Sequence, residues 1–301
     1  MQAVVFEETG DPDVLHLGDR PEPQAGAGQV LIEVRAASVN PADVKRVAGS
    51  FGEVELPAGT GYDAAGVVLA VGEGVDHLAA GDEVFGLGQQ THAVRAVLTA
   101  AARKPAVWSW AEAAAAGVAG ETADRGLSLL GVSAGDVVLV DGGAGGVGTF
   151  AVQLAVARGA TVIATGSDRN HDYLRSLGAI PVRYGDGLAD RVAAVRAEQG
   201  LGEVTAVFDV VGKTPAEVLV SLAPRPEQVV SIANFDAPAH GARVTGGGDG
   251  VTDAATSLAA VAALADRLTI PIEKEYPLVQ ASDAFALVAE GHVRGKVVLL
   301  P

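Results

Sequence analysis

A glycine-rich segment near the middle of the chain has the residue types and spacing of a phosphate-binding turn. Glycines at 143, 145 and 148 fit the pattern G-x-G-x-x-G, between a strand-like apolar run at 137–140 and helical spacing at 147–158. Glycine permits the tight turn, the close approach of a pyrophosphate and the packing of helix on strand. The helix N-terminus offers N–H groups and partial positive charge to phosphates. We therefore predict that a dinucleotide binds at Gly143, Gly145, Gly146, Val147 and Gly148.

The residues after the next predicted strand, 160–165, bear on which nicotinamide dinucleotide binds. NAD selectivity normally uses an acidic residue at this strand end to hold the ribose hydroxyls. The aligned residue is Gly166, while Ser167 and Arg169 can bind a 2′-phosphate, so the sequence favours NADPH. A shift of the register by two residues would place Asp168 in the acidic position and favour NAD instead.

The residue types give little support for a catalytic metal, a thiol nucleophile or a histidine general acid. The six histidines, at 16, 77, 92, 171, 240 and 292, lack metal-ligand spacing such as H-E-x-x-H, and the chain has no cysteine for a disulfide, thiol nucleophile or metal centre. We therefore expect no zinc or other catalytic metal. His92 is a poor candidate for a general acid, and we interpret Tyr62 and Asp63 as packing residues.

The elements around the glycine segment alternate in the way expected of a parallel sheet. Strand-like runs at 137–140, 161–165, 204–210 and 228–232 are separated by helical patterns at 147–158, 171–177, 187–199 and 215–222. The first third is rich in β-branched runs, a helix is expected at 110–130, and Gly246–Gly250 reads as a loop.

Composition restricts the function classes. The length of 301 residues allows about two domains, and 49% hydrophobic with 19% charged residues indicates a globular chain. A formal net charge of −16 disfavours nucleic acid and anionic membranes as partners. The N-terminus does not read as a signal peptide, and the apolar runs end before the roughly 18 residues of a membrane span. We therefore expect a cytoplasmic enzyme.

Several motifs, taken together and in order, resemble one protein family. They are 1–8 (MQAVVFEE), 37–45 (ASVNPADVK), 61–68 (GYDAAGVV), 71–75 (VGEGV), 80–85 (AGDEVF), 142–148 and 292–298 (HVRGKVV). The chain resembles the zinc-free quinone oxidoreductase (zeta-crystallin-like) branch of the medium-chain dehydrogenase/reductase superfamily. The resemblance implies an α/β fold: a GroES-like β-rich catalytic domain, 1–117 and 260–301, and an inserted Rossmann domain, 118–259, with a doubly wound parallel sheet.

The resemblance also implies an activity and its partners: transfer of hydride from NADPH to a quinone or similar conjugated carbonyl, without zinc, often in a homodimer with a cleft between the domains. An enoyl or alkenal reductase acting on C=C double bonds is an alternative on the same scaffold. A non-catalytic NADPH-binding protein is an alternative of another class, because fold does not fix function.

Further site residues are implied by the family motifs. Asn40 corresponds to a residue beside the nicotinamide and substrate, Thr122 to one near the nicotinamide, and Tyr184 to one beside the adenosine. The remaining positions would border the carboxamide through backbone groups or bring a cation to the cofactor: Ser231, Ala233, Asn234, Arg294 and Lys296.

Each of these assignments has a plainer structural alternative. Asn40 can be a turn residue before proline, Thr122 a cap at a helix start and Tyr184 a packing residue, while Arg294 and Lys296 can be ordinary surface charges. Asp43 and Lys45 read as a solvated charged pair on a short helix.

The chain departs from the family pattern at residues 86–93, at Val44 and at Glu121. All three departures are expected near the substrate, so they leave its identity open.

Overall fold

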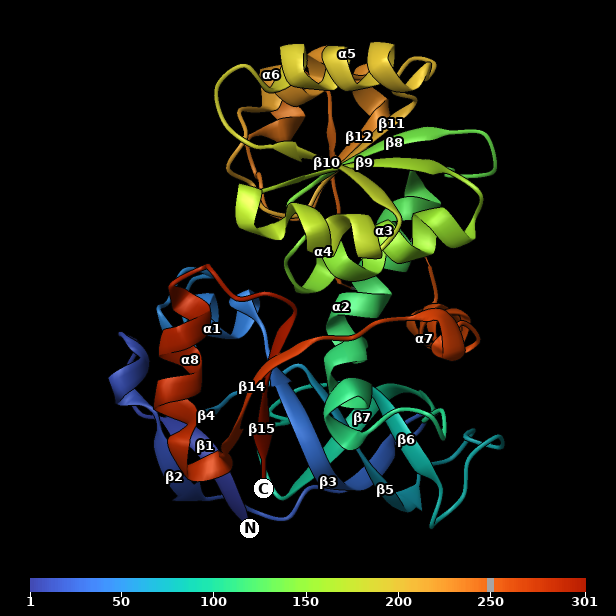
Figure 1. Cartoon of the computed structure of the whole chain (residues 1–301). Coiled ribbons are helices and arrows are strands. Elements are labelled where there is room, and N and C mark those ends of the chain that lie inside the picture. Colours follow the sequence, from blue (N-terminus) through green and yellow to red (C-terminus); the bar gives the residue numbers. More distant parts are fainter. Residues whose placement is uncertain (248–251) are drawn as a thin grey trace. The chain divides into compact units, whose positions relative to one another are not determined.

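The computed structural model describes residues 1–247 and 252–301, and the chain divides into two compact units (Figure 1). Unit 1 combines Met1–Glu121 with Ala254–Pro301, and unit 2 is Thr122–Asp253. The loop expected at 246–250 is described only at Gly246 and Gly247, and its other three residues lie outside the described part.

Unit 1 is built on β-strands from both ends of the chain. Its larger sheet has the order β14-β15-β3-β5-β6-β7, and an additional β3–β7 pairing joins four of these strands into a closed ring. A smaller sheet has the order β2-β1-β4. The bounds are β1 (Gln2–Phe6), β2 (His16–Asp19), β3 (Val30–Val39), β4 (Ala58–Gly59), β5 (Asp63–Val71), β6 (Glu83–Gly88), β7 (Arg95–Arg103), β14 (Ile272–Pro277) and β15 (Lys296–Leu300).

Alternating apolar residues explain how these strands form a core. Val30, Ile32 and Val34 in β3 are buried, and they pack in one cluster with residues of β5, β6 and β7. Such alternation places every second side chain on the core face of a strand. The C-terminal strand β15 pairs antiparallel with β3, with Val297 opposite Val39. This pairing brings the 296 region beside the 40 region.

Helices complete unit 1. A second apolar cluster includes residues of α1 and α8 and of the strands β1 and β15. The helices are α1 (Pro41–Val47), α7 (Ala254–Ala262) and α8 (Ala281–Ala289), with short 3-10 helices at η1 (Pro12–Val14), η5 (Ala265–Arg267) and η6 (Leu278–Gln280). Helix α2 (Trp110–Leu129) begins in unit 1 and ends in unit 2.

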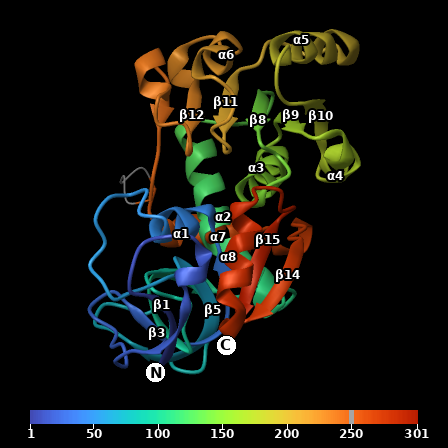
Figure 2. The same cartoon turned by 90° about the vertical axis from the view of Figure 1, so that its left-hand side faces the viewer.

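Unit 2 is a doubly wound parallel sheet. Its order is β10-β9-β8-β11-β12-β13, all pairs are parallel, and Figure 2 shows β12, β11, β8, β9 and β10 in this sequence across the sheet. Helices α3 and α4 cover one face and α5 and α6 the other (Figure 1). The strand order reverses between β8 and β11, where ligands bind at the carboxyl ends of strands in open α/β sheets.

The bounds of the unit 2 elements are β8 (Val137–Asp141), α3 (Gly146–Ala157), β9 (Thr161–Gly166), η2 (Asp168–Asn170), α4 (His171–Ser176), β10 (Ala179–Arg183), α5 (Leu188–Gln199), β11 (Ala206–Asp209), α6 (Ala216–Ser221), η3 (Pro226–Gln228), β12 (Val229–Ser231), η4 (Ala237–His240) and β13 (Arg243–Val244). In the described part of the chain, no helix combines the length and the apolar character needed to cross a membrane.

Candidate cofactor site and buried polar network

Of the three glycines of the G-x-G-x-x-G pattern between β8 and α3, one is open and two are closely packed. A Cβ at Gly143 would lie 2.8 Å from Ala164 Cβ, and one at Gly148 would lie 2.1 Å from Gly142 O. These two glycines therefore allow helix, loop and strand to pack together. At Gly145, the N-cap of α3, the nearest atom to an added Cβ is 3.8 Å away. The loop thus leaves space over its second glycine, which fits the approach of a pyrophosphate.

A buried carboxylate holds the glycine loop in place. Asp141 ends β8, and its Oδ1 accepts a 2.5 Å hydrogen bond from the Thr165 hydroxyl, whose oxygen accepts a bond from the Gly142 N–H at 2.8 Å. Burial raises the pKa of Asp141 above its usual range. This chain of bonds joins the ends of β8 and β9 to the first loop residue, so the loop is preorganised without a ligand.

A second carboxylate fixes the loops after β11 and β12. Asp209 Oδ2 accepts from the Ser231 hydroxyl at 2.7 Å, and Ser231 Oγ accepts from the N–H groups of Ala233 and Asn234 at 3.1 and 2.8 Å. Asp209 Oδ1 also accepts from the N–H of Gly212 at 2.8 Å. The Ser231 side chain therefore holds the backbone of the predicted nicotinamide segment, and the contact of this segment with the carboxamide stays a prediction.

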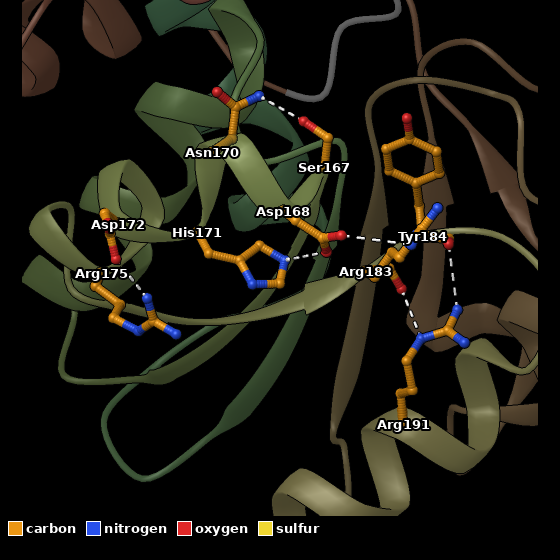
Figure 3. A network of polar contacts seen from close by, with 9 residues as sticks. All are labelled: Ser167, Asp168, Asn170, His171, Asp172, Arg175, Arg183, Tyr184 and Arg191. Atoms are coloured by element: carbon orange, nitrogen blue, oxygen red, sulfur yellow. Dashed lines mark hydrogen bonds and ion pairs between the residues drawn. The ribbon is translucent and has the colours of Figure 1, made fainter.

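Two of the residues predicted for the adenosine end, Ser167 and Tyr184, directly follow β9 and β10 (Figure 3). The parallel register places Arg183 beside Gly166, and Tyr184 follows with 54% of its surface exposed. Ser167 Oγ accepts a 3.3 Å bond from the Asn170 side chain. Arg183 Nη1 lies 3.4 Å from Asp168 Oδ2. Arg183 is not among the residues predicted from the sequence, although it immediately precedes the predicted Tyr184.

Arg191, on α5, fixes the turn that follows β10 (Figure 3). Its guanidinium donates to the carbonyls of Arg183 at 2.9 Å, Tyr184 at 3.2 Å, Gly185 at 2.9 Å and Asp186 at 2.7 Å. Gly185 has a φ of 90°, in the region that favours glycine, which lets the turn reverse towards α5. The only sequence signal for this brace is an arginine a few residues after a glycine-rich turn.

In unit 1 a lysine and an asparagine far apart in sequence form a buried pair. Lys296 Nζ donates to Asn40 Oδ1 at 2.5 Å and to Val39 O at 3.4 Å, and the Asn40 amide donates to Asp63 Oδ1 at 3.0 Å and to Ser38 O at 3.4 Å. Lys296 is 5% exposed and Asn40 3%. The alternative of Lys296 as a surface charge is therefore wrong. Its predicted approach to the cofactor, and the contact of Asn40 with the reacting groups, stay predictions.

Two aspartates complete this network. Asp43 is fully buried, and it accepts from the backbone N–H of Asn40 at 2.8 Å and of Gly61 at 3.0 Å. Burial raises its pKa to about 6, against the opposing effect of these bonds and of Lys296. Asp63 accepts from the Ser38 hydroxyl at 2.7 Å, and burial raises its pKa as well. The expected solvation of Asp43 is wrong, because it caps α1 from inside the core; Lys45 alone is exposed.

His92 lies in the same network and is fully buried. Its Nε2 is 3.0 Å from Ser38 O, a pure acceptor, so Nε2 carries the proton and Nδ1 accepts from the Thr60 hydroxyl at 2.9 Å. Burial lowers the pKa of His92 to about 4. Both ring nitrogens are thus engaged in a neutral imidazole, which agrees with its being a poor general acid.

Thr122 lies within α2, so the alternative of a cap at a helix start is wrong. Its hydroxyl accepts a 3.4 Å bond from Arg125, which also donates to the hydroxyl of Thr245. Arg294 is half-buried, ahead of β15, and Arg169 is exposed within η2. No group of three or more metal-ligating side chains occurs within residues 1–247 and 252–301.

Comparison with known proteins decides the family. The alcohol dehydrogenase GroES-like domain model matches residues 26–199, and the zinc-binding dehydrogenase model matches residues 184–299. The chain belongs to the medium-chain dehydrogenase/reductase superfamily. Despite the name of the second model, this member of the superfamily has no cysteine with which to hold zinc.

Relatives along the whole chain include an NADPH-dependent alkenal/one oxidoreductase of Arabidopsis thaliana, 34% identical over 100% of this chain and 80% of the relative. The quinone oxidoreductase of Coxiella burnetii is 34% identical with a TM-score of 0.85, over 100% of this chain and 99% of that one. A mycobacterial protein complexed with NADPH is 28% identical with a TM-score of 0.83, over 100% of both chains. The chain spans 58% or less of the length of further curated relatives, several of them polyketide synthases.

Proposed function

We propose that this chain catalyses NADPH-dependent reduction of a quinone or similarly conjugated carbonyl without zinc. The observation that carries the proposal is the preorganised glycine loop, which is open at Gly145, at the strand switch of a parallel sheet. The names of the Coxiella burnetii and Arabidopsis thaliana relatives support the acceptor class and the cofactor. NADPH, when bound, supplies the hydride from C4 of its nicotinamide.

The residues of unit 2 would bind and orient the cofactor. The backbone of the glycine loop and the N-terminus of α3 would hold the pyrophosphate, and Ser167, Arg169 and Tyr184 would surround the adenosine with its 2′-phosphate. We propose that the segment from Ser231 to Asn234, together with Arg294 and Lys296, contacts the cofactor elsewhere. Asn40 and Thr122 are the proposed contacts of the reacting groups.

The absence of cysteine ligands bears on the reaction type. Hydride transfer to a saturated carbonyl places charge on one oxygen, which needs a Lewis acid or a strong proton donor. Quinones and enones spread this charge by conjugation. His92 is neutral, buried and engaged at both nitrogens, so it is not suited to supply a proton. A conjugated acceptor therefore fits the chain's own residues better than a simple ketone.

The second candidate is reduction of an alkenal or enone at its C=C bond, which the name of the Arabidopsis thaliana relative favours. A panel of quinones, enones, alkenals and saturated ketones, each with NADPH and the unaltered chain, separates these activities. Acceptor-dependent oxidation of NADPH by quinones supports the first proposal, and faster oxidation by alkenals supports the second. Tight NADPH binding with no oxidation by any acceptor would instead support a non-catalytic binding protein.

We also propose that the enzyme is a cytoplasmic homodimer. The support is the resemblance to the quinone oxidoreductase branch. Light scattering of the purified chain tests the dimer, and fractionation of the source cells tests the compartment.

A further inference from the structure

The carboxylate of Asp168 and the guanidinium of Arg183 face one another across the ends of two neighbouring strands (Figure 3). Arg183 is the last residue of β10 and pairs in register with Gly166, the last residue of β9, two residues before Asp168. The two charged atoms are 3.4 Å apart. The adenosine end of the predicted site therefore contains an aspartate and an arginine that form an ion pair with each other.

This ion pair is easily displaced. The Asp168 side chain is 69% exposed and that of Arg183 66%, and the single contact between them is long. Water screens such exposed pairs, so their contribution to an equilibrium is small. Within residues 1–247 and 252–301, Arg183 forms no other side-chain hydrogen bond or ion pair. Its guanidinium can therefore leave Asp168 for a stronger anion.

The surroundings allow the side chains to move while the backbone stays fixed. Arg191 holds the carbonyls of Arg183 and Tyr184, so the base of the Arg183 side chain is anchored. On the other side of Asp168, the buried Nε2 of His171 lies 3.8 Å from Asp168 Oδ1 and has no hydrogen-bond partner among the described residues. In the tautomer that carries the proton on Nε2, this nitrogen can donate to the freed carboxylate of Asp168.

We propose that Asp168 and Arg183 form a displaceable pair that sets the choice between NADPH and NADH. The 2′-phosphate of NADPH displaces the Asp168 carboxylate from the Arg183 guanidinium, because a phosphate carries nearly two negative charges and its oxygens match the guanidinium donors. NADH has no such phosphate and leaves the pair intact. The proposal rests on the proposed function, since it assumes that the adenosine binds at this strand end. It also assigns Asp168 a role opposite to that of a ribose-binding acid.

Binding of 2′,5′-ADP and 5′-AMP to the full-length chain, measured by calorimetry, tests the pair apart from the reaction. Arg183→Gln should weaken 2′,5′-ADP about tenfold, as expected for loss of a bond between charged groups, and leave 5′-AMP unchanged. Asp168→Asn should strengthen 2′,5′-ADP about two- to fivefold, because Arg183 no longer has to leave a partner. In the double variant that combines Asp168→Asn with Arg183→Gln, the gain in 2′,5′-ADP affinity from Asp168→Asn should disappear.

A neighbouring pair provides matched controls. Asp172 and Arg175 on α4 form an exposed ion pair of 2.7 Å in the same region. Asp172→Asn and Arg175→Gln make the same charge changes and should leave the ratio of the affinities for 2′,5′-ADP and 5′-AMP unchanged.

Three results would overturn the proposal. The first is an unchanged ratio of the affinities for 2′,5′-ADP and 5′-AMP in Arg183→Gln. The second is a gain in 2′,5′-ADP affinity from Asp168→Asn that persists without Arg183, and the last is weaker 5′-AMP binding in Asp168→Asn. The last would make Asp168 a ribose acid, and the second would mean simple repulsion of the phosphate. Failure of the proposed function would appear elsewhere, as no acceptor-dependent oxidation of NADPH by the unaltered chain. If the chain binds neither nucleotide, both proposals fail.

Discussion

Replacing Lys296 with methionine removes a buried ammonium and leaves its polar partners in place. In the native chain Lys296 donates to Asn40 Oδ1 at 2.5 Å, and its charge favours the ionised forms of Asp63 and Asp43. Methionine fills a similar volume but cannot donate. Removing one partner of a buried charged network costs about 3–5 kcal/mol, because the remaining charges stay desolvated without compensation. We expect a loss of this size in the free energy of unfolding of unit 1.

Tryptophan fluorescence during urea unfolding measures this loss selectively. Both tryptophans of the chain, Trp108 and Trp110, lie in unit 1. Arg35→Met is a matched control, because Arg35 forms an exposed ion pair with Glu33 and should cost at most about 1 kcal/mol. If Lys296→Met alone does not fold, the double variant with Asp63→Asn should recover part of the stability, since both charges are then absent.

The pH dependence gives a second check on the same reasoning. Without Lys296, the pKa values of Asp43 and Asp63 should rise further above their usual range, and protonation at pH 5 should relieve part of the loss seen at pH 7. A loss below about 1 kcal/mol at pH 7 would contradict the assignment of a buried charged network. So would a loss that is equally large at pH 5.

The remaining predictions concern titration, the loop and the reaction. Asp43 has a folded pKa of about 6, so it contributes stability at low pH, and this contribution is lost as pH rises through 6. His92 has a folded pKa of about 4, so it contributes stability at high pH, and this contribution is lost as pH falls from about 6.5. Urea unfolding of Asp43→Asn between pH 4 and 7 should therefore show stability that rises more steeply with pH than in the native chain. Gly145→Ala should weaken NADPH binding at least tenfold with nearly native stability, because its Cβ enters open space. Gly148→Ala should lower the melting temperature, because its Cβ would lie 2.1 Å from Gly142 O. Equal losses of NADPH binding and equal melting temperatures in the two variants would contradict this. In steady-state assays, conjugated acceptors should react far faster than saturated ketones, and Asn40→Ala should lower turnover with little change in NADPH affinity; full activity of that variant would remove Asn40 from the proposed site.

The sequence predicted the local elements of unit 2 closely. The helix expected at 147–158 is α3 (Gly146–Ala157), and the strands expected at 137–140 and 161–165 are β8 and β9 to within one residue. Hydrophobic periodicity and glycine position are local properties, so they are readable without tertiary contacts. The same holds for the glycine loop, where the need for glycine at 143 and 148 is explained by the close packing around them.

The side-chain partnerships were decided only by tertiary structure. Asn40 and Lys296 are 256 residues apart in sequence, and it is the pairing of β15 with β3 that joins them. Asp43 reads as a solvated charge on a short helix, but the fold buries it against Gly61. Arg183 meets Asp168 because parallel strands end at one edge in a particular register. Composition and motif order determined the family and the kind of cofactor, since these depend on residue types along the chain. The partners of each charge depend on which strands pair and in which register, and these long-range contacts leave no local pattern in the sequence.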